Sequence, residues 1–112
     1  MKLKLSNKEI HFRLQNDELD SLLAGKTLHE KLVMPGGALF SYSVAILQGS
    51  APIALNYREG DLCLSISRET LQRLVSAPSK EGVSGHYAHS GKRMAFSVAV
   101  DLGAAGCERA SL

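Results

Sequence analysis

The sequence has 112 residues, with 13 Lys and Arg against 11 Asp and Glu, which gives a formal net charge of +2. A chain of this length fits one domain, residues 1–112, that buries about two thirds of its unfolded surface and needs no disulfide, metal or cofactor for stability. The small positive charge excludes a strongly basic nucleic-acid-binding protein, so any basic effect has to be local.

The start of the chain has the pattern of a strand rather than of a leader. Polar and apolar residues alternate directly after Met1. No apolar run reaches the roughly 18 residues that a membrane span needs. We therefore expect a cytoplasmic protein without a membrane segment.

Residues 2–24 predict a β-hairpin followed by a short helix. Polar and apolar residues alternate with the period of a half-buried strand as far as Leu14, interrupted only at Asn7-Lys8, which suits a tight turn. The apolar spacing then changes to three and four residues, which is the stripe of an amphipathic helix. Its apolar positions are Leu19, Leu22 and Leu23.

The turn of this hairpin decides which residues share a face. A two-residue loop places Leu3, Leu5, Ile10 and Phe12 on the core side. The same register puts Lys4 opposite His11, and Lys2 opposite Arg13, on the other side. Like charges that face each other across two strands are unfavourable. We therefore predict a locally basic outer face.

A second hairpin is predicted from residues 28–33 and 38–47. Pro35-Gly36-Gly37 would form the loop, with Gly37 in the left-handed conformation. This loop pairs Leu32 with Phe40, Glu30 with Tyr42 and Leu28 with Val44.

The second half of the chain repeats this order. Residues 54–76 match 2–24 without a gap, at an offset of 52 positions from Leu3 to Leu55, again with a hairpin and then an apolar stripe at Leu71, Leu74 and Val75. Residues 83–88 and 93–101 predict a last hairpin that turns at Ser90-Gly91. Its apolar face lies 54 positions after that of residues 38–47, with Met94, Phe96, Val98 and Val100 against Phe40, Tyr42, Val44 and Ile46.

The reverse faces of these two strands carry only small side chains. They are Ser41, Ser43 and Ala45 in the first half, and Ala95, Ser97 and Ala99 in the second. Small side chains let another layer approach closely, so we place both strands at the centre of the sheet.

The predicted fold is α+β, a curved antiparallel sheet or open barrel with two short helices. A β-β-α-β-β unit is duplicated with pseudo-twofold symmetry, as pseudo-repeats 2–50 and 54–103, followed by a flexible tail, 104–112. The alternative is that two unrelated hairpin-helix units share their alternation without duplication.

Four residues of the outer face, Lys2, Lys4, His11 and Arg13, form the predicted ligand-binding site. A phosphate or carboxylate would relieve the opposition of their charges. The alternative is a solvated strand face that discourages aggregation. No aromatic side chain lies among these cations to stack on bases, so nucleic acid is not the expected partner.

The remaining reactive residues form no catalytic or metal pattern. His86 and His89 are three positions apart in a predicted strand, so they point to opposite faces and cannot share a metal ion. Cys63 and Cys107 have no metal-type spacing. Cys63 would act as a thiolate only if the fold brought His11 or His86 near it. No paired carboxylates are present, and we predict no catalytic residue.

The opening of the chain resembles that of a family of short uncharacterised bacterial proteins. The resemblance lies in Lys2-Leu3-Lys4-Leu5, Asn7, Ile10, Phe12-Arg13-Leu14, Glu18-Leu19 and Leu22, with a later aromatic strand at Leu39-Phe40-Ser41-Tyr42. It implies a bacterial, cytoplasmic protein with a domain of unknown function, and it assigns no site residue.

We expect a small non-enzymatic binding or assembly module that forms a homodimer, because no catalytic constellation is present and uncharged strand faces suit a contact surface. The faces in question include Ala54, Asn56, Cys63 and Ser65. The alternative is a binder of an anionic metabolite, or a small enzyme acting on one, that uses the basic face. Contact of that face with RNA is a third interpretation.

Overall fold

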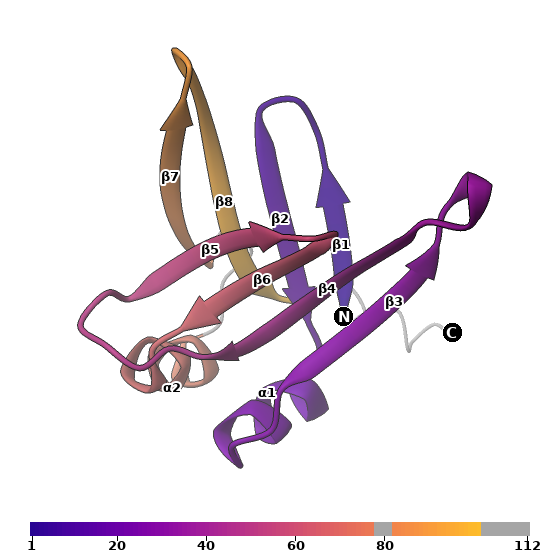
Figure 1. Ribbon diagram of the computed structural model, residues 1–112. Helices are drawn as coiled ribbons and strands as arrows, with labels where there is room; N and C mark the ends of the chain where they lie inside the picture. The colour runs from indigo at the N-terminus through magenta and orange to yellow at the C-terminus, as the bar shows by residue number, and fades with distance from the viewer. Residues whose placement is uncertain (78–81, 102–112) are drawn as a thin grey trace, which may run out of the picture.

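The computed structural model describes residues 1–77 and 82–101 (Figure 1). The elements follow in the order β1 (Lys2–Leu5), β2 (Glu9–Leu14), α1 (Asn16–Leu23), β3 (Leu28–Val33), the 3-10 turn η1 (Pro35–Gly37), β4 (Leu39–Ile46), β5 (Ile53–Arg58), β6 (Asp61–Ile66), α2 (Arg68–Ser76), β7 (Val83–His89) and β8 (Lys92–Val100). The fold is α+β, as predicted. The predicted tail, 104–112, lies outside the described residues.

The strands form two mixed sheets rather than one antiparallel sheet. Sheet A has the order β1-β2-β8-β7, and sheet B has the order β3-β4-β6-β5. All four predicted hairpins form, and the registers predicted for the first two are confirmed, with Leu3 opposite Phe12 and Leu32 opposite Phe40 as examples. However, β2 pairs with β8, and β4 with β6, in parallel. The prediction of antiparallel neighbours throughout was therefore wrong at the centre of each sheet.

The parallel pairs join hairpins from opposite ends of the chain. Each half contributes one hairpin to each sheet, because α1 carries the chain from sheet A to sheet B and α2 precedes its return. Side-chain alternation is the same in parallel and antiparallel pairs, so the sequence pattern does not fix the direction of a neighbouring strand. The prediction that residues 38–47 and 93–101 are central strands is confirmed, since β4 and β8 are both internal.

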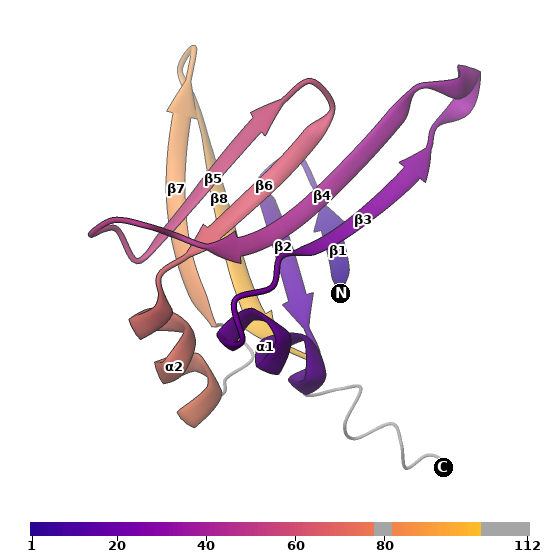
Figure 2. The ribbon, with the colours of Figure 1, turned by 60° about the horizontal axis from the view of Figure 1, so that its bottom comes forward.

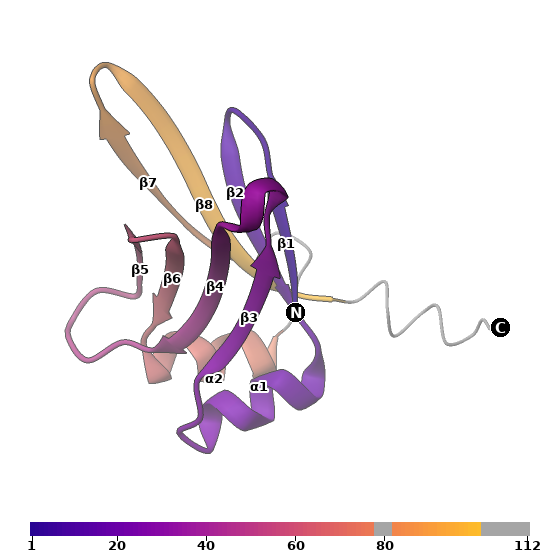
Figure 3. The same cartoon turned by 45° about the vertical axis from the view of Figure 1, so that its right-hand side comes forward.

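The two sheets are closed by the helices at one end and diverge at the other (Figures 2 and 3). Near the helices the inward side chains are fully buried, as at Leu14, Ile66 and Val98. Toward the hairpin ends the same faces open to solvent, so Leu5 is 57% exposed although it lies on the predicted core side. The prediction of an open barrel was therefore correct in that the strands do not close. It was wrong in that they form two sheets and not one continuous sheet.

Hydrogen bonds cap the start of both helices, and their apolar stripes pack much as the sequence predicts. The backbone N–H of Gln15 donates to Glu18 Oε1 over 2.8 Å at the start of α1, and the N–H of Thr70 donates to Ser67 Oγ over 3.1 Å at the start of α2. The buried helix positions are Leu19, Leu22, Leu71 and Leu74, together with Thr70. Val75, predicted to belong to the apolar stripe, is instead exposed.

Aromatic residues fill the space between the sheets. The rings of Phe12 in sheet A and Tyr42 in sheet B meet edge to face, with 6.4 Å between their centroids. Within sheet A, Gly85 lies opposite Phe96, and a Cβ atom added to Gly85 would stand 2.7 Å from Cζ of that ring. The glycine is thus required by the close approach of the ring and not by its backbone angles.

Substitution Gly85→Ala should lower the free energy of unfolding by about 1–3 kcal/mol, because the Phe96 ring has to move out of its place. Phe96→Leu shortens the opposing side chain, so the double variant should lose less stability than the two single losses added together. Urea unfolding of the four proteins measures this coupling. Ala88→Ser, at an exposed position of the same strand, is the control. Strictly additive losses would show that the ring and the glycine do not compete for space.

Candidate functional site

A pocket of about 410 Å³ lies on the outer face of sheet A. It contains three of the four predicted basic residues, Lys4, His11 and Arg13. We call it the basic pocket. Its lining residues are Lys4, Glu9, His11, Arg13, Ser84, His86, Ala95, Phe96 and Ser97.

The pocket follows from the unequal size of the side chains on this face. Strand β2 turns Glu9, His11 and Arg13 outward, whereas the part of β8 that pairs with β2 turns out Ala95, Ser97 and Ala99. The parallel register sets His11 beside Ser97 and Arg13 beside Ala99. The small residues of β8 therefore form a floor, and the long side chains of β1 and β2 form a wall. The small-residue face that was predicted to admit another layer is here part of a hollow.

His11 is held in place by a residue from the far end of the chain. Its Nδ1 lies 2.5 Å from Ser97 Oγ, and the imidazole is partly buried. Burial lowers the pKa of His11 below its ordinary value of 6.5, and the charge of Arg13 lowers it further; Glu9 raises it, and Lys4 again lowers it. The neutral ring, oriented by the serine, is therefore the form favoured near neutral pH.

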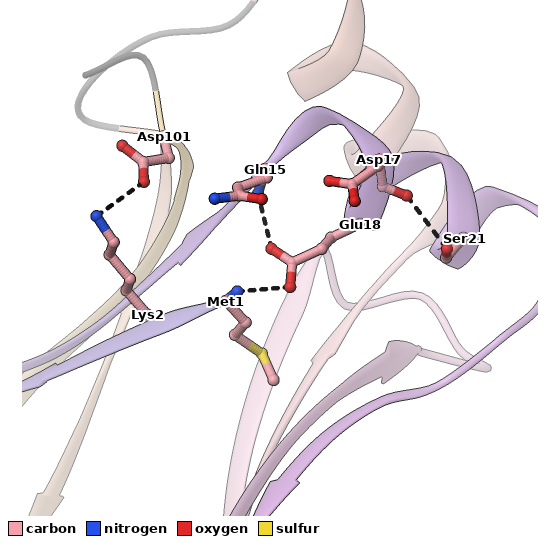
Figure 4. A network of polar contacts seen from close by, with 7 residues as sticks. All are labelled: Met1, Lys2, Gln15, Asp17, Glu18, Ser21 and Asp101. Carbon is pink, nitrogen blue, oxygen red and sulfur yellow. Dashed lines mark hydrogen bonds and ion pairs between the residues drawn. The ribbon is translucent and has the colours of Figure 1, made fainter. Parts of the chain in front are cut away.

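Lys2 does not join the other predicted cations. Its Nζ lies 3.3 Å from Oδ2 of the buried Asp101, which directly follows β8 (Figure 4). Nearby, the α-amino group of Met1 contacts Glu18, whose other oxygen caps α1. Register alone placed Lys2 with the basic face, but the proximity of Asp101 draws it to the end of the sheet.

Sequence reasoning missed four polar residues of the basic pocket. Three of them, Ser84, His86 and Ser97, come from the last hairpin, and the fourth, Glu9, comes from β2 itself. The parallel pairing of β2 with β8 brings the three together with Lys4 and Arg13, and no local pattern encodes it. The available signals were the run of small residues in β8 and the outward direction of Glu9 in the hairpin register.

The other reactive residues lie apart from one another. His86 lines the basic pocket, whereas His89 lines a second pocket between β5, β6 and β7, in agreement with their predicted opposite directions. Cys63 lies in sheet B between Ser43 and Asn56, so the fold does not bring it to His11 or His86 in sheet A. In residues 1–77 and 82–101, no three His, Cys, Asp or Glu side chains gather where they could share a metal ion.

On the outer face of sheet B, one carboxylate has polar partners within the protein. Asp61 accepts a hydrogen bond from Ser41 Oγ over 2.8 Å, and its Oδ1 lies 4.0 Å from His29 Nε2. Asp61 follows Glu9 by 52 positions, so it holds the place in sheet B that Glu9 holds in sheet A. Asp61, which is paired on sheet B, therefore has Glu9 of the basic pocket as its counterpart on sheet A.

The pKa of His11 makes stability depend on pH. Its pKa is lower in the folded protein than in the unfolded chain, so the unfolded chain binds the proton more readily. The contribution of His11 is present above pH 6.5 and is lost as pH falls through the folded-state pKa. We expect His11→Asn to lose less stability than wild type on acidification below pH 6.5, in urea unfolding at a series of pH values. His89→Asn, on the other face, is the control; equal losses in wild type and His11→Asn would contradict the assignment.

Comparison with known proteins places the chain in a family but assigns it no activity. No curated protein and no solved structure matches it significantly. Of the helices in residues 1–77 and 82–101, neither is long and apolar enough to cross a membrane. The sequence matches the family of unknown function DUF7009 over residues 1–103. The chain therefore belongs to the DUF7009 family.

Proposed function

We propose that the protein binds a small molecule bearing a phosphate or carboxylate group in the basic pocket. The observation that carries this proposal is the convergence of Lys4, His11 and Arg13 from two strands on one hollow floored by small residues. The volume of about 410 Å³ is within the range of about 300–1,000 Å³ that is usual for ligand sites. A basic face without a hollow would have favoured the solvated alternative.

The chemistry of the lining suits an anion. Lys4 lies directly opposite His11, and Arg13 is the next outward residue of β2, so positive charge accumulates in one part of the pocket. Arg presents two parallel N–H donors to a carboxylate or phosphate, and the hydroxyl groups of Ser84 and Ser97 add neutral donors. If Ser97 donates its hydroxyl proton to Nδ1 of His11, the single N–H proton of the neutral imidazole is on Nε2, which becomes one more donor.

A phosphorylated or carboxylated ligand should raise the melting temperature by mass action. At 100 times its Kd the ligand adds about 2.7 kcal/mol, which is about 10 °C or more for a domain of this size. Replacing both pocket cations, Lys4→Gln with Arg13→Gln, should abolish the shift in differential scanning fluorimetry. The matched control removes two exposed cations of sheet B, Lys31→Gln with Arg58→Gln, and should keep it. The absence of a shift across phosphate, phosphate esters and carboxylates would remove the proposal.

The second candidate function is an assembly module that forms a homodimer. The observation that favours it is an apolar end on the β3–β4 hairpin, which projects from the body of the protein (Figure 1). Four large apolar side chains are exposed there, Leu32, Val33, Met34 and Leu39, and β3 is an edge strand of sheet B. A cluster of this kind is typical of contact surfaces.

Under this second proposal, sedimentation of the wild-type chain should show a dimer that dissociates on dilution. Val33→Glu with Leu39→Glu should give a monomer at every concentration, because each charge would be buried without a partner. Tyr57→Glu with Tyr87→Glu adds the same charge on two other hairpins and should leave the dimer intact. A wild-type chain that is monomeric throughout would exclude the module as a homodimer.

We also propose that the two halves arose by duplication of one β-β-α-β-β unit. The order of strands in sheet B equals that in sheet A when the halves are exchanged. The registers support the same mapping, since Ile10 lies beside Phe96 in sheet A and Leu62 lies beside Tyr42 in sheet B. Under this proposal the outer face of sheet A kept or gained a pocket, while on sheet B the equivalent carboxylate, Asp61, became paired with Ser41 and His29.

A cytoplasmic location stays a prediction.

A further inference from the structure

We infer that the ligand of the basic pocket has two chemically different ends, an anionic group beside Lys4 and Arg13 and a hydroxylated body that reaches Glu9, as in a sugar phosphate or a sugar acid. This inference rests on the proposed function and adds the class of molecule. It depends on the size of the pocket, the placement of its one carboxylate and the neutral polar groups between the two ends.

The pocket is too large for an anionic group alone. At about 30 Å³ for each polar heavy atom, the volume share of a water molecule, an inorganic phosphate would fill roughly a third of it. The pocket itself measures about 410 Å³. A ligand that fills the pocket therefore carries a body about twice as large as its charged group.

The charges of the pocket are separated along β2. Glu9, His11 and Arg13 face outward in succession, and alternate residues of a strand lie about 6.6–6.8 Å apart, so the backbones at Glu9 and Arg13 are about 13 Å apart. Lys4 lies opposite His11, midway along β2 between Glu9 and Arg13, and its long, flexible side chain can reach an anion that also contacts Arg13. An anionic group placed beside Lys4 and Arg13 gains from both cations and stays away from the Glu9 carboxylate.

The other end of the pocket favours a ligand that donates hydrogen bonds. An ionised carboxylate such as that of Glu9 only accepts hydrogen bonds. Across Ala95 from Glu9 lies His86, and the middle of the pocket holds the hydroxyl groups of Ser84 and Ser97. Hydroxyl groups and imidazoles both donate and accept, which matches the hydroxyl groups of a sugar. Glu9 is exposed, so an apolar body placed over it would displace water from the carboxylate without replacing the hydrogen bonds of that water.

Titration calorimetry of the full chain tests this inference with three phosphate probes that share one anionic group. Ribose 5-phosphate has a hydroxylated body, pentyl phosphate has a five-carbon body without hydroxyl groups, and inorganic phosphate has no body. We expect ribose 5-phosphate to bind about tenfold or more tightly than pentyl phosphate, because a hydrogen bond to a charged group outweighs a neutral one. Sugar acids with a carboxylate in place of the phosphate then distinguish the two anions.

The variant Glu9→Gln isolates the role of the carboxylate. It should reduce the preference for ribose 5-phosphate about tenfold while leaving pentyl phosphate and inorganic phosphate bound at least as tightly as before. A structural role of Glu9 would instead weaken all three probes together. Glu69→Gln, on the exposed face of α2, is the matched control and should change none of the affinities.

Other outcomes separate this inference from the proposed function. Equal binding of ribose 5-phosphate and pentyl phosphate by the wild-type chain would overturn the two-ended ligand while leaving the anion site intact. Tighter binding of 2-aminoethyl phosphate than of ribose 5-phosphate would also overturn it, in favour of a ligand with an ammonium group near Glu9. Binding of none of the phosphate or carboxylate probes would overturn the proposed function itself.

Discussion

The parallel pairing of β2 with β8 is the constraint on which the rest of the structure depends. It joins the first hairpin of the chain to the last, and the pairing of β4 with β6 joins the two middle hairpins in the same way. Each half therefore shares its hydrogen bonds and its apolar face with the other half. The core that results draws on both sheets and both helices, from Phe12 and Leu14 to Leu71 and Val98. Neither half could bury these side chains by itself.

The same pairing creates the chemistry of the outer face. It sets the charged residues of β2 directly beside the small residues of β8, and it brings Ser97 to His11 although 86 positions separate them in the chain. A strand with long side chains in place of β8 would fill the hollow. The outer face of sheet B shows what happens when a carboxylate there finds partners within reach, since Asp61 is held by Ser41 and His29. In the basic pocket, by contrast, two cations and one carboxylate face a volume large enough for a ligand.

The closed and open ends of the two sheets separate stability from surface chemistry. Beside the helices, α1 and α2 contact each other, and Arg68 of α2 donates to the carbonyl oxygen of Leu23 over 2.9 Å. This end contains the fully buried residues. At the opposite end, the hairpins diverge and expose apolar side chains such as Tyr57 and Val33. Substitutions at the hairpin ends should therefore cost less stability than substitutions near the helices, because folding buries less apolar surface at the hairpin ends.

The sequence by itself determined the local structure of this protein. Alternation and turn residues predicted the four hairpins and the registers of the first two, down to the pairing of Leu32 with Phe40, because a turn and the period of a strand act over a few neighbouring residues. The helix stripes followed from the same kind of local pattern. The register of the first hairpin also predicted three residues of the candidate site, Lys4, His11 and Arg13, since this hairpin carries them on one face.

Only the tertiary structure decided how these units combine. The division into two sheets, the parallel joins, the exposure of Leu5 and the pairing of Lys2 with Asp101 all depend on contacts between residues distant in the chain. Alternation carries no information about the direction of a neighbouring strand, and a register does not say which charges lie within reach beyond the end of a sheet. Glu9 could have been placed on the basic face from its hairpin alone. The residues of the last hairpin, Ser84, His86 and Ser97, could not, because a parallel strand 86 positions away is invisible to any local pattern.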